Sequence, residues 1–441
     1  MKIINIVPGF GGTFYCGNCL RDSAFVASLQ KAGHDAVILP VYLPLTQNAL
    51  NHHQETPVFY GAVNIYLKQQ FPILKRMPGW VENLLNSSAV LKFASSKAGS
   101  TRAEGMEALT ESMLLGMEGN QSHELEQLVH YLKHHEKPDV VHFSNALLLG
   151  MAHQIREEVG VPVVCSLQDE DVWVDAMHPQ YQDQMWKLIA EKAKDVDAFI
   201  AVSKFFGEVM KEKLKIPGEK LHVVHIGIDP QRYEFGLPAF NPRAIGYLSR
   251  ICEENGFGIV ADAFIQLKKD PQFSDLRLKV TGGSTGDDKR FIHKQWKKFK
   301  TSGIENSVEF IDDFSMNGLK SFFRSITVLS VPVLKGEAFG LYQIEALASG
   351  IPIIQPQIGA FPEIINATGG GLLYHPNTPS ELAKTLSKTL SDPDLLNKKS
   401  LSGRREVENQ FDCNKLTIQM TKIYHQLASS PVDELTSSPI H

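Results

Sequence analysis

The sequence predicts an α/β protein with two doubly wound, Rossmann-like domains, each built on a parallel sheet covered by helices. Short apolar runs alternate with longer helical patterns over most of the 441 residues. The runs have no alternating polar positions, which is typical of parallel strands buried on both faces. The series starts again after residues 227–242, a stretch rich in Gly and Pro. This restart indicates two domains joined by a linker.

The first series belongs to a predicted domain over residues 1–226. Its predicted strands are 2–7, 36–42, 139–143, 161–167 and 198–202, and its predicted helices are 18–32, 145–159, 178–195 and 204–214. Residues 44–122 form an insertion that is too long for an ordinary connection between a strand and a helix. We expect this insertion to contain helices of its own, one of them near residues 79–94.

The second series belongs to a predicted domain over residues 243–410. Its predicted strands are 244–249, 276–281, 308–311, 327–331 and 351–355, and its predicted helices are 256–269, 287–301, 315–324, 340–349 and 378–391. A further helix is predicted over residues 411–428. The polar residues 429–441 are expected to form a mobile tail.

The charge balance and the composition exclude several functional classes. Lys and Arg number 44 and Asp and Glu number 49, so the formal net charge is −5. This balance argues against nucleic-acid binding, which normally needs an excess of Lys and Arg. The sequence has no run of 18 apolar residues and its first residues lack the pattern of a signal peptide, so we expect a cytoplasmic protein.

The cysteines do not indicate a disulfide framework, because there are five of them in a long chain. Cys16 and Cys19 form a Cys-x-x-Cys pair beside the N-terminal glycines. A redox role would need a thiol of low pKa, and a zinc site would need two further ligands of suitable geometry. Since no second pair is present, we expect a plain role at the start of a helix.

Residues 328–354 are the most informative segment and are predicted to form strand, loop, helix and strand. Gly340 would lie at the first turn of the helix, where backbone N–H groups lack partners and the helix dipole is positive. Such a helix end binds diphosphate, and glycine lets a ligand approach the backbone. Glu337 precedes the helix and Glu345 lies inside it, eight positions later. Carboxylates there could accept hydrogen bonds from sugar and ribose hydroxyls, or could be a helix cap and a solvated glutamate.

This segment resembles the signature of family 4 glycosyltransferases, in which a Glu is followed by Phe-Gly and by a second Glu eight positions after the first. Further similar stretches are 11–12, 31–34, 139–142, 246–250, 278–283, 359–363 and 411–428. The resemblance implies the GT-B fold, with two Rossmann-like domains that face each other across a cleft. It also implies that the C-terminal helix crosses back to the first domain.

The resemblance further implies a retaining transfer of a sugar from a nucleotide-sugar donor to an unidentified hydroxyl acceptor, which could be a saccharide, a small molecule or a lipid-linked molecule. Arg250 should contact the donor diphosphate, Glu337 the transferred sugar and Glu345 the nucleotide ribose. The other donor-binding residues are expected to approach the donor through backbone groups: Gly12, Gly283, Phe339, Gly340 and Leu341. No metal or other cofactor is implied.

One departure from the family pattern concerns the donor. Asn255 stands five residues after Arg250, where the family usually has a lysine that binds the diphosphate. Lys335 could partly replace that lysine, or it could remain an exposed loop residue. The same departure keeps open an alternative function, a nucleotide-sugar-binding protein with weak or lost transferase activity.

A second departure concerns the acceptor. Similar enzymes often have His-Asp after the corresponding strand, whereas this sequence has Gln168-Asp169-Glu170-Asp171. Gln168 cannot act as a base, so Asp169 is the better candidate to orient the acceptor hydroxyl. The Asp-x-Asp spacing also fits the metal pattern of other glycosyltransferases, but a hard cation would require further ligands.

Two further interpretations are weaker. A nicotinamide-dependent oxidoreductase is disfavoured because residues 9–12 lack the full Gly-x-Gly-x-x-Gly spacing. Residues 61–103 hold six Lys or Arg and one acid. This stretch could form an interfacial helix for peripheral contact with the inner membrane face, or a packed stripe with a solvated basic face.

Overall fold

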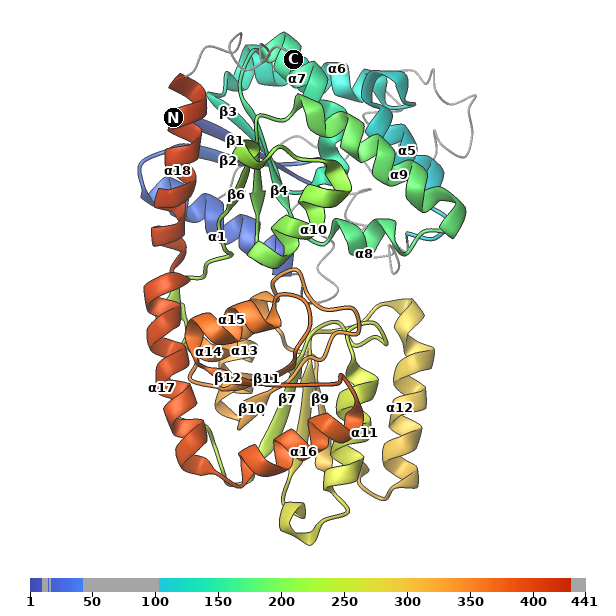
Figure 1. Ribbon diagram of the computed structural model, residues 1–441, viewed down its shortest axis with the longest axis vertical. Helices are drawn as coiled ribbons and strands as arrows, with labels where there is room; N and C mark the ends of the chain where they lie inside the picture. Colours follow the sequence, from blue (N-terminus) through green and yellow to red (C-terminus); the bar gives the residue numbers. More distant parts are fainter. Residues whose placement is uncertain (10–14, 16, 43–102, 430–441) are drawn as a thin grey trace. The chain divides into compact units, whose positions relative to one another are not determined.

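The computed structural model describes residues 1–9, 15, 17–42 and 103–429 (Figure 1). Several predictions fall outside these residues: the helix near 79–94, the basic stretch at 61–103, the roles of Gly12 and Cys16, and nearly all of the tail at 429–441. No helix among the described residues is both long and apolar enough to span a bilayer.

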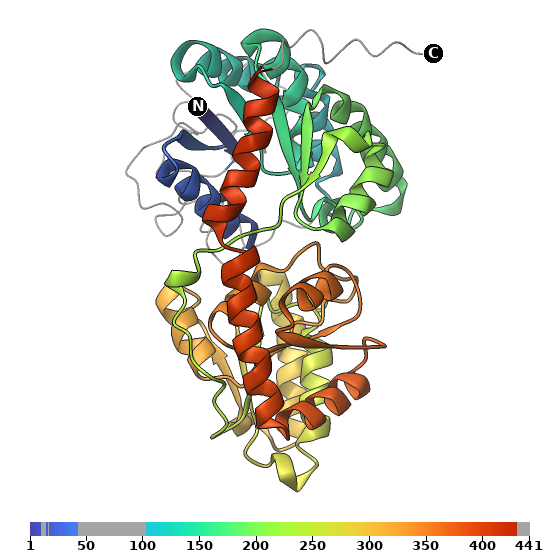
Figure 2. The same ribbon diagram turned by 60° about the vertical axis from the view of Figure 1, so that its left-hand side comes forward.

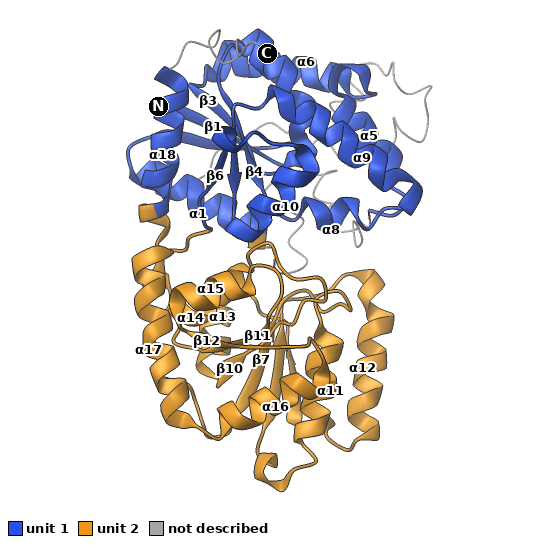
Figure 3. Ribbon diagram, viewed as in Figure 1, with its two compact units in different colours: residues 1–11, 18–225, 416–441 blue, residues 12–17, 226–415 orange. Residues whose placement is uncertain are grey.

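The chain forms two compact units (Figure 3). Unit 1 consists of residues 1–11, 18–225 and 416–441, and unit 2 consists of residues 12–17 and 226–415. The predicted linker at 227–242 therefore lies within unit 2. The short segment 12–17, which follows the first strand in sequence, also belongs to unit 2.

Unit 1 contains a six-stranded parallel sheet with the strand order β2-β1-β3-β4-β5-β6. Its strands are β1 (Lys2–Val7), β2 (Asp35–Pro40), β3 (Val140–Phe143), β4 (Val163–Leu167), β5 (Ala198–Ala201) and β6 (Leu221–Val223). Every residue of β3, β4 and β5 is buried. This burial explains why the strands read as continuous apolar runs without polar alternation.

The helices of unit 1 lie between and around these strands. They are α1 (Gly17–Lys31), α5 (Glu107–Leu115), α6 (Ser122–Tyr131), α7 (Ala152–Val159), α8 (Glu170–Val174), α9 (Pro179–Lys192) and α10 (Lys204–Leu214). The predicted helix at 145–159 is divided into a 3-10 turn, Ala146–Met151, and α7. Helix α5 lies within the predicted insertion at 44–122.

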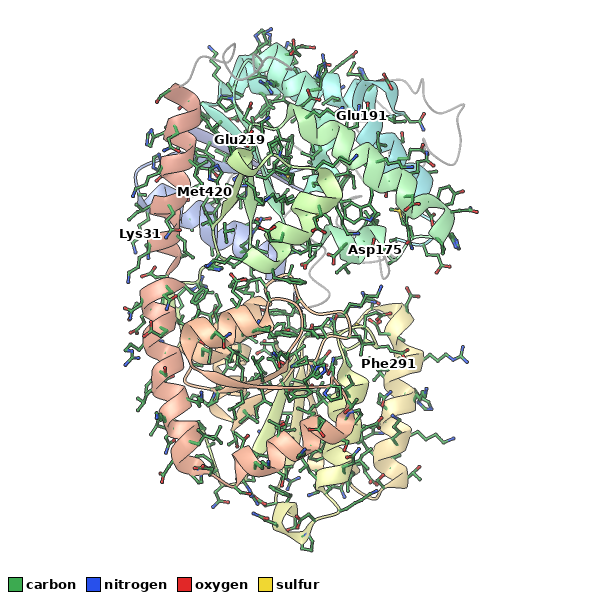
Figure 4. The ribbon with its side chains drawn as sticks, viewed as in Figure 1. Lys31, Asp175, Glu191, Glu219, Phe291 and Met420 are labelled. Atoms are coloured by element: carbon green, nitrogen blue, oxygen red, sulfur yellow. The ribbon has the colours of Figure 1, made fainter. Side chains whose placement is uncertain are left out.

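The C-terminal helix α18 (Cys413–Ser429) packs against the unit 1 sheet from Leu416 onward, as Figure 2 shows. Met420 points from α18 into the core (Figure 4). Tyr424 on α18 is hydrogen-bonded through its hydroxyl to Nδ1 of His142 on β3. Burial lowers the pKa of His142 to about 3, so this imidazole is neutral. The apolar and hydrogen-bonded contacts confirm the predicted return of the last helix to the first half of the chain.

Unit 2 contains a second six-stranded parallel sheet, with the strand order β12-β11-β10-β7-β8-β9. Its strands are β7 (Ala244–Leu248), β8 (Arg277–Thr281), β9 (Val308–Ile311), β10 (Val328–Leu329), β11 (Ile353–Pro356) and β12 (Gly371–Tyr374). The two sheets confirm the predicted pair of doubly wound α/β folds. The sequence reasoning missed β6 and β12, which are short and only partly buried.

The helices of unit 2 follow its strands. They are α11 (Phe257–Leu267), α12 (Lys289–Thr301), α13 (Met316–Arg324), α14 (Leu341–Ala348), α15 (Phe361–Thr368), α16 (Pro379–Leu390) and α17 (Pro393–Gln410). Local signals explain several of their starts. Ser315 and Thr378 accept hydrogen bonds from backbone N–H groups of α13 and α16, as N-cap residues do.

Candidate active site

The strand order of unit 2 reverses between β7 and β10, which are neighbours in the sheet but not consecutive in the chain. Ligands of open α/β sheets bind outside the carboxyl ends of the strands at such a point. Arg250 follows β7, and Glu337 lies in the loop that follows β10. The two loops are hydrogen-bonded, since the Leu334 N–H donates to the Glu254 carbonyl at 3.0 Å. The structure thus brings the Arg250 and Glu337 segments to one place in the sheet.

Arg250 is held by a buried acid. Its Nε and Nη2 atoms each donate to a different carboxylate oxygen of Asp288, both at 2.9 Å. The side chain of Asp288 is 5% exposed and that of Arg250 is 31% exposed. Burial alone would raise the pKa of Asp288, but hydrogen bonds from Arg250 and Thr285 outweigh it and hold that pKa below its usual range. The guanidinium therefore keeps its charge and a defined orientation.

Asn255 stabilises the turn that carries Arg250. Its side-chain Nδ2 donates to Ser249 Oγ at 2.8 Å and to the Arg250 carbonyl at 3.2 Å. The neighbouring Gly282-Gly283 turn lies against the same backbone, because the Ile251 N–H donates to the Gly283 carbonyl at 2.9 Å. Asn255, which stands where the family usually has a lysine, thus has a local structural role. Its predicted contact with the donor stays a prediction, as does that of Gly283.

The N-terminus of α14 begins at Gly340, which has a φ of 80°. A Cβ at this position would lie 2.9 Å from Gln343 Nε2 and 3.1 Å from Glu337 Cγ. All eight residues of α14 are buried, and Phe339 just before it is 1% exposed. The first turn of a fully buried helix thus presents its backbone beside Glu337 without an intervening side chain.

Glu337 is half-buried and is oriented from two sides. Tyr342, on the first turn of α14, donates its hydroxyl to Glu337 Oε2 at 3.1 Å. The Glu337 carbonyl accepts from the Ala360 N–H at 2.9 Å. Gly359, with a φ of 59°, approaches so closely that a Cβ there would lie 2.6 Å from the Glu337 backbone nitrogen. The loop carrying Glu337 is therefore fixed by the neighbouring Gly359–Pro362 stretch, whereas Lys335 is exposed.

Glu345 lies on α14, eight positions after Glu337, and is 1% exposed. Tyr15 donates its hydroxyl to Oε2 at 2.5 Å, and Tyr233 donates to Oε1 at 2.6 Å. Burial raises the pKa of Glu345 to about 7, although both tyrosine hydrogen bonds act in the opposite direction. Its predicted contact with ribose stays a prediction.

Sequence reasoning missed both of these tyrosines. Tyr15 precedes Glu345 by 330 positions, and no local pattern connects them. The available signal was Glu345 itself: a carboxylate inside an apolar helix that is buried needs hydrogen-bond donors. Tyr15 also donates its backbone N–H to the Gly282 carbonyl at 2.9 Å, so Tyr15 is attached to the turn beside Arg250.

In unit 1, Asp169 follows β4 and has a φ of 57°, a left-handed conformation that is uncommon for a residue with a side chain. Asn18 Nδ2 donates to Asp169 Oδ2 at 3.1 Å. Burial raises the pKa of Asp169 to about 6, while the Asn18 hydrogen bond acts in the opposite direction. A strained, partly desolvated acid at a strand end is typical of functional sites.

Glu170 is the most perturbed carboxyl beside it. Burial raises its pKa to about 8, even though the Ala146 N–H donates to its Oε1 at 2.9 Å. Within the described residues, Glu170 Oε2 and Gln168 Oε1 are buried and have no hydrogen-bond partner. Gln168 Nε2 donates to the Ser144 carbonyl at 2.8 Å, as does Arg21 Nη2 at 3.3 Å. Polar groups from the ends of β3 and β4 thus converge near Asp169.

The acids described above are not arranged as a metal site. In the portion of the chain that the structure describes, no group of three or more His, Cys, Asp or Glu side chains is arranged to hold a metal ion. The expectation of a reaction without a metal stays a prediction.

Comparison with known proteins gives the same class of protein as the fold and the site. The family model described as group 1 glycosyl transferases matches residues 234–405, and the model described as glycosyltransferase family 4 matches residues 119–232. The first range contains Arg250, Glu337 and Glu345, and the second contains Asp169 and Glu170. A GT-B sugar transferase is the class that this fold defines.

Curated relatives are similar over parts of their length. The D-inositol 3-phosphate glycosyltransferase of Corynebacterium jeikeium is 28% identical over 164 residues, which are 37% of this chain and 39% of that protein. The MMP alpha-(1->4)-mannosyltransferase of Mycolicibacterium hassiacum is 25% identical over 300 residues, 65% of this chain and 70% of that protein. The chain belongs to the family 4 glycosyltransferases.

Solved structures show the likeness of fold over nearly the whole chain. Sucrose-phosphate synthase from Thermosynechococcus elongatus aligns with a TM-score of 0.71 and 18% identity, covering 98% of this chain and 100% of that one. HepE from Anabaena, in complex with UDP, aligns with a TM-score of 0.68 and 15% identity, covering 97% and 100%. At these identities the likeness shows the fold alone.

Proposed function

We propose that this protein transfers a sugar from a nucleoside diphosphate sugar to a hydroxyl acceptor and retains the configuration of the anomeric carbon. The observation that carries the proposal is the arrangement at the β7–β10 switch point. There an oriented guanidinium and a fixed carboxylate lie on two hydrogen-bonded loops, and the first turn of a buried helix follows the second loop. The guanidinium and the helix N-terminus suit a diphosphate, and the carboxylate suits the hydroxyls of a sugar.

Arg250 and the α14 N-terminus would share the donor diphosphate. As the bond between the anomeric carbon and the diphosphate oxygen breaks, negative charge grows on the leaving group. A guanidinium that is already oriented by Asp288 would stabilise that charge without reorganising. The backbone N–H groups at the start of α14 would add fixed dipoles of the same sign.

Glu337 would hold the transferred sugar through its hydroxyls. In a same-face transfer, the acceptor oxygen bonds to the anomeric carbon on the side from which the diphosphate leaves, and the acceptor proton passes to a departing phosphate oxygen. No protein nucleophile is then needed, and the role of Glu337 would be to position the sugar. Asp169 would orient the acceptor hydroxyl.

The donor is proposed to be a uridine nucleotide sugar. HepE, whose fold this chain shares, has been solved with UDP and with UDP-glucose. The chain's own residues support a diphosphate and a sugar but do not distinguish the base. A thermal-shift panel of UDP, GDP and ADP with their glucose and mannose conjugates would identify the donor before any acceptor is known.

The test of the function is substitution of the two charged residues. Glu337→Ala and Arg250→Ala are each expected to lower sugar transfer at least about a hundredfold, since an interaction used in the transition state contributes a few kcal/mol. Arg324→Ala and Glu234→Ala are matched controls, because these residues form an exposed ion pair elsewhere in unit 2. The product's anomeric configuration, read by NMR, tests retention. Unchanged transfer in both site variants, with folding intact, would overturn the proposal.

A binding protein without turnover is the second candidate, and Asn255 favours it because a positive charge is absent where relatives have one. The discriminating result is tight, calorimetrically measured donor binding with neither transfer nor donor hydrolysis. In that case Asn255→Lys would be the informative variant. Gain of turnover by this variant would assign the loss of activity to position 255.

A further inference from the structure

Helix α12 of unit 2 carries a cationic face that has no role in the proposed reaction. Its sequence, KRFIHKQWKKFKT, contains six Lys or Arg residues and no acid, although the whole chain has a net charge of −5. We define the cationic face as the four exposed residues Arg290, Lys294, Lys297 and Lys300. Their spacing of three or four residues places them along one side of the helix over about 15 Å.

The opposite side of α12 anchors the helix in unit 2. Phe291 packs edge-on against Phe257 of α11, with 6.4 Å between ring centroids, and it points toward α11 in Figure 4. Trp296 packs in the same way against Phe310 of β9, at 5.7 Å. The apolar residues of α12 are thus used inside the unit, and the side that remains exposed is polar and charged.

The cationic face forms no ion pair among the residues that the structure describes. Lys298, on the border of the face, pairs with Asp262 at 2.6 Å, but none of the four residues of the face forms an ion pair there.

Two cations on other helices of unit 2 form ion pairs within their own helix, whereas exposed Lys388 and Lys398 form none among the described residues. Lys384 pairs with Glu381 on α16 and Arg404 with Glu408 on α17. Like charges three or four positions apart destabilise a helix, so an anionic ligand on the cationic face would relieve this repulsion.

We propose that the cationic face of α12 binds anionic phospholipid headgroups at a membrane surface. A polybasic helix face is attracted to anionic lipid by charge alone. Single-stranded nucleic acid is bound with exposed aromatic side chains, and protein interfaces depend on buried aromatic or apolar anchors. The exposed side of α12 offers neither, because its aromatic residues pack into unit 2. The proposal does not depend on the transferase activity.

The experiment is sedimentation of the full chain with vesicles of phosphatidylcholine alone and of a two-to-one mixture of phosphatidylcholine and phosphatidylglycerol. The test variant replaces the whole cationic face: Arg290→Gln, Lys294→Gln, Lys297→Gln and Lys300→Gln. The control variant removes the same charge from four separate exposed lysines of the described chain: Lys194→Gln, Lys215→Gln, Lys388→Gln and Lys398→Gln. Thermal unfolding verifies that both variants fold.

The wild type and the control are expected to bind the anionic vesicles and to be released when salt rises from about 50 to about 500 mM, which shortens the screening length severalfold. The α12 variant is expected to bind at least about tenfold more weakly, because each removed charge contributes separately to the attraction. Equal binding by both variants, or equal binding to neutral vesicles, would overturn the proposal. So would binding to a DNA duplex, lost in the α12 variant, with no vesicle binding.

Discussion

The carboxyl ends of the two parallel sheets carry polar sites of different construction. In unit 2, the charged groups Arg250 and Asp288 neutralise each other through two hydrogen bonds, and glycines let backbone segments approach closely. In unit 1, the acids Asp169 and Glu170 lie side by side, and burial raises the pKa of both. The unit 2 site is organised by an ion pair and backbone geometry beside one buried carboxyl, Glu345, and the unit 1 site by two adjacent carboxyls of raised pKa.

The two constructions suit the two different ligands of the proposed function. A diphosphate is highly charged, so its site needs fixed donors and a cation that is already oriented. A hydroxyl acceptor is neutral, so a carboxyl of raised pKa can accept or exchange a proton with it near neutral pH. Under the proposed function, the same kind of sheet would support two chemistries through the residues placed after its strands.

The largest predicted effect concerns the pH dependence of the free energy of unfolding, to which one buried glutamate in each site contributes. Glu170 and Glu345 have pKa values raised by burial from 4.5 to about 8 and about 7. A carboxyl whose pKa is raised on folding stabilises the folded state fully below its unfolded pKa, and this contribution is lost as the pH rises through the folded pKa. Glu170→Gln and Glu345→Gln should therefore remove about 5 and about 3 kcal/mol of pH-dependent stability, at 1.36 kcal/mol per unit.

Hydrogen exchange of peptides from each unit, followed between pH 5 and pH 9, measures this effect. Glu170→Gln should flatten the pH dependence of unit 1 peptides, and Glu345→Gln that of unit 2 peptides. Glu208→Gln, at an exposed position of α10, is the control and should leave both profiles unchanged. Profiles that stay unaltered in the first two variants would contradict the burial argument.

The second prediction concerns the glycine turn of the unit 2 site. Gly282 has a φ of 116°, and a Cβ there would lie 2.4 Å from the Ser249 carbonyl oxygen. Gly282→Ala should lower the free energy of unfolding by about 3 kcal/mol, because strain and a backbone clash combine. Gly33→Ala is the matched control, since Gly33 has a φ of 88° but open space around it, and it should cost about 1 kcal/mol.

Urea unfolding with unit-specific exchange readouts would measure both variants. Gly282→Ala should also weaken donor binding, because the displaced Ser249 backbone leads directly into Arg250. Equal effects of the two glycine substitutions on stability would show that the close approach at Gly282 is not a constraint.

The smallest predicted effect tests whether Asp288 acts through Arg250. Asp288→Asn keeps the size of the side chain but removes the charge that orients the guanidinium. Transfer is expected to fall about tenfold, mainly in kcat, because a misoriented cation loses part of its transition-state contribution. Asp275→Asn breaks a comparable pair with Arg243 in the same unit and should leave kcat unchanged. A fall in stability without any change in kcat or KM would assign Asp288 a structural role alone.

Much of the fold was predictable because its signals are local. Strands β1 and β9 and helix α10 begin and end at the predicted residues, and the structure shows that Ser203 caps α10. Two of the missed elements lack such signals, since β12 is only partly buried and α8 has five residues. Helix α17 was missed although Asp392 caps its start. The segment around Gly340 was also predictable, since a glycine between a loop and an apolar helix has few alternatives.

The candidate site was predictable to the extent that it lies within one continuous segment. Glu337, Gly340 and Glu345 were singled out from their positions around a predicted helix start, and Arg250 from the resemblance of residues 246–250 to the family. The hydrogen-bond partners of these residues were not predicted. They are Asp288 for Arg250, Tyr342 for Glu337, and the two tyrosines for Glu345. Most of these partners come from other strands, helices or loops.

By itself, the sequence determined the order of strands and helices, the helix start at Gly340 and the chemical types of the site residues, because these depend on neighbours along the chain. The tertiary structure alone decided which carboxyls are buried, which donors they meet and which cations are left exposed, as on α12. The physical reason is that burial and pairing depend on neighbours in space. In this fold, the phenol that meets Glu345 comes from a residue 330 positions earlier.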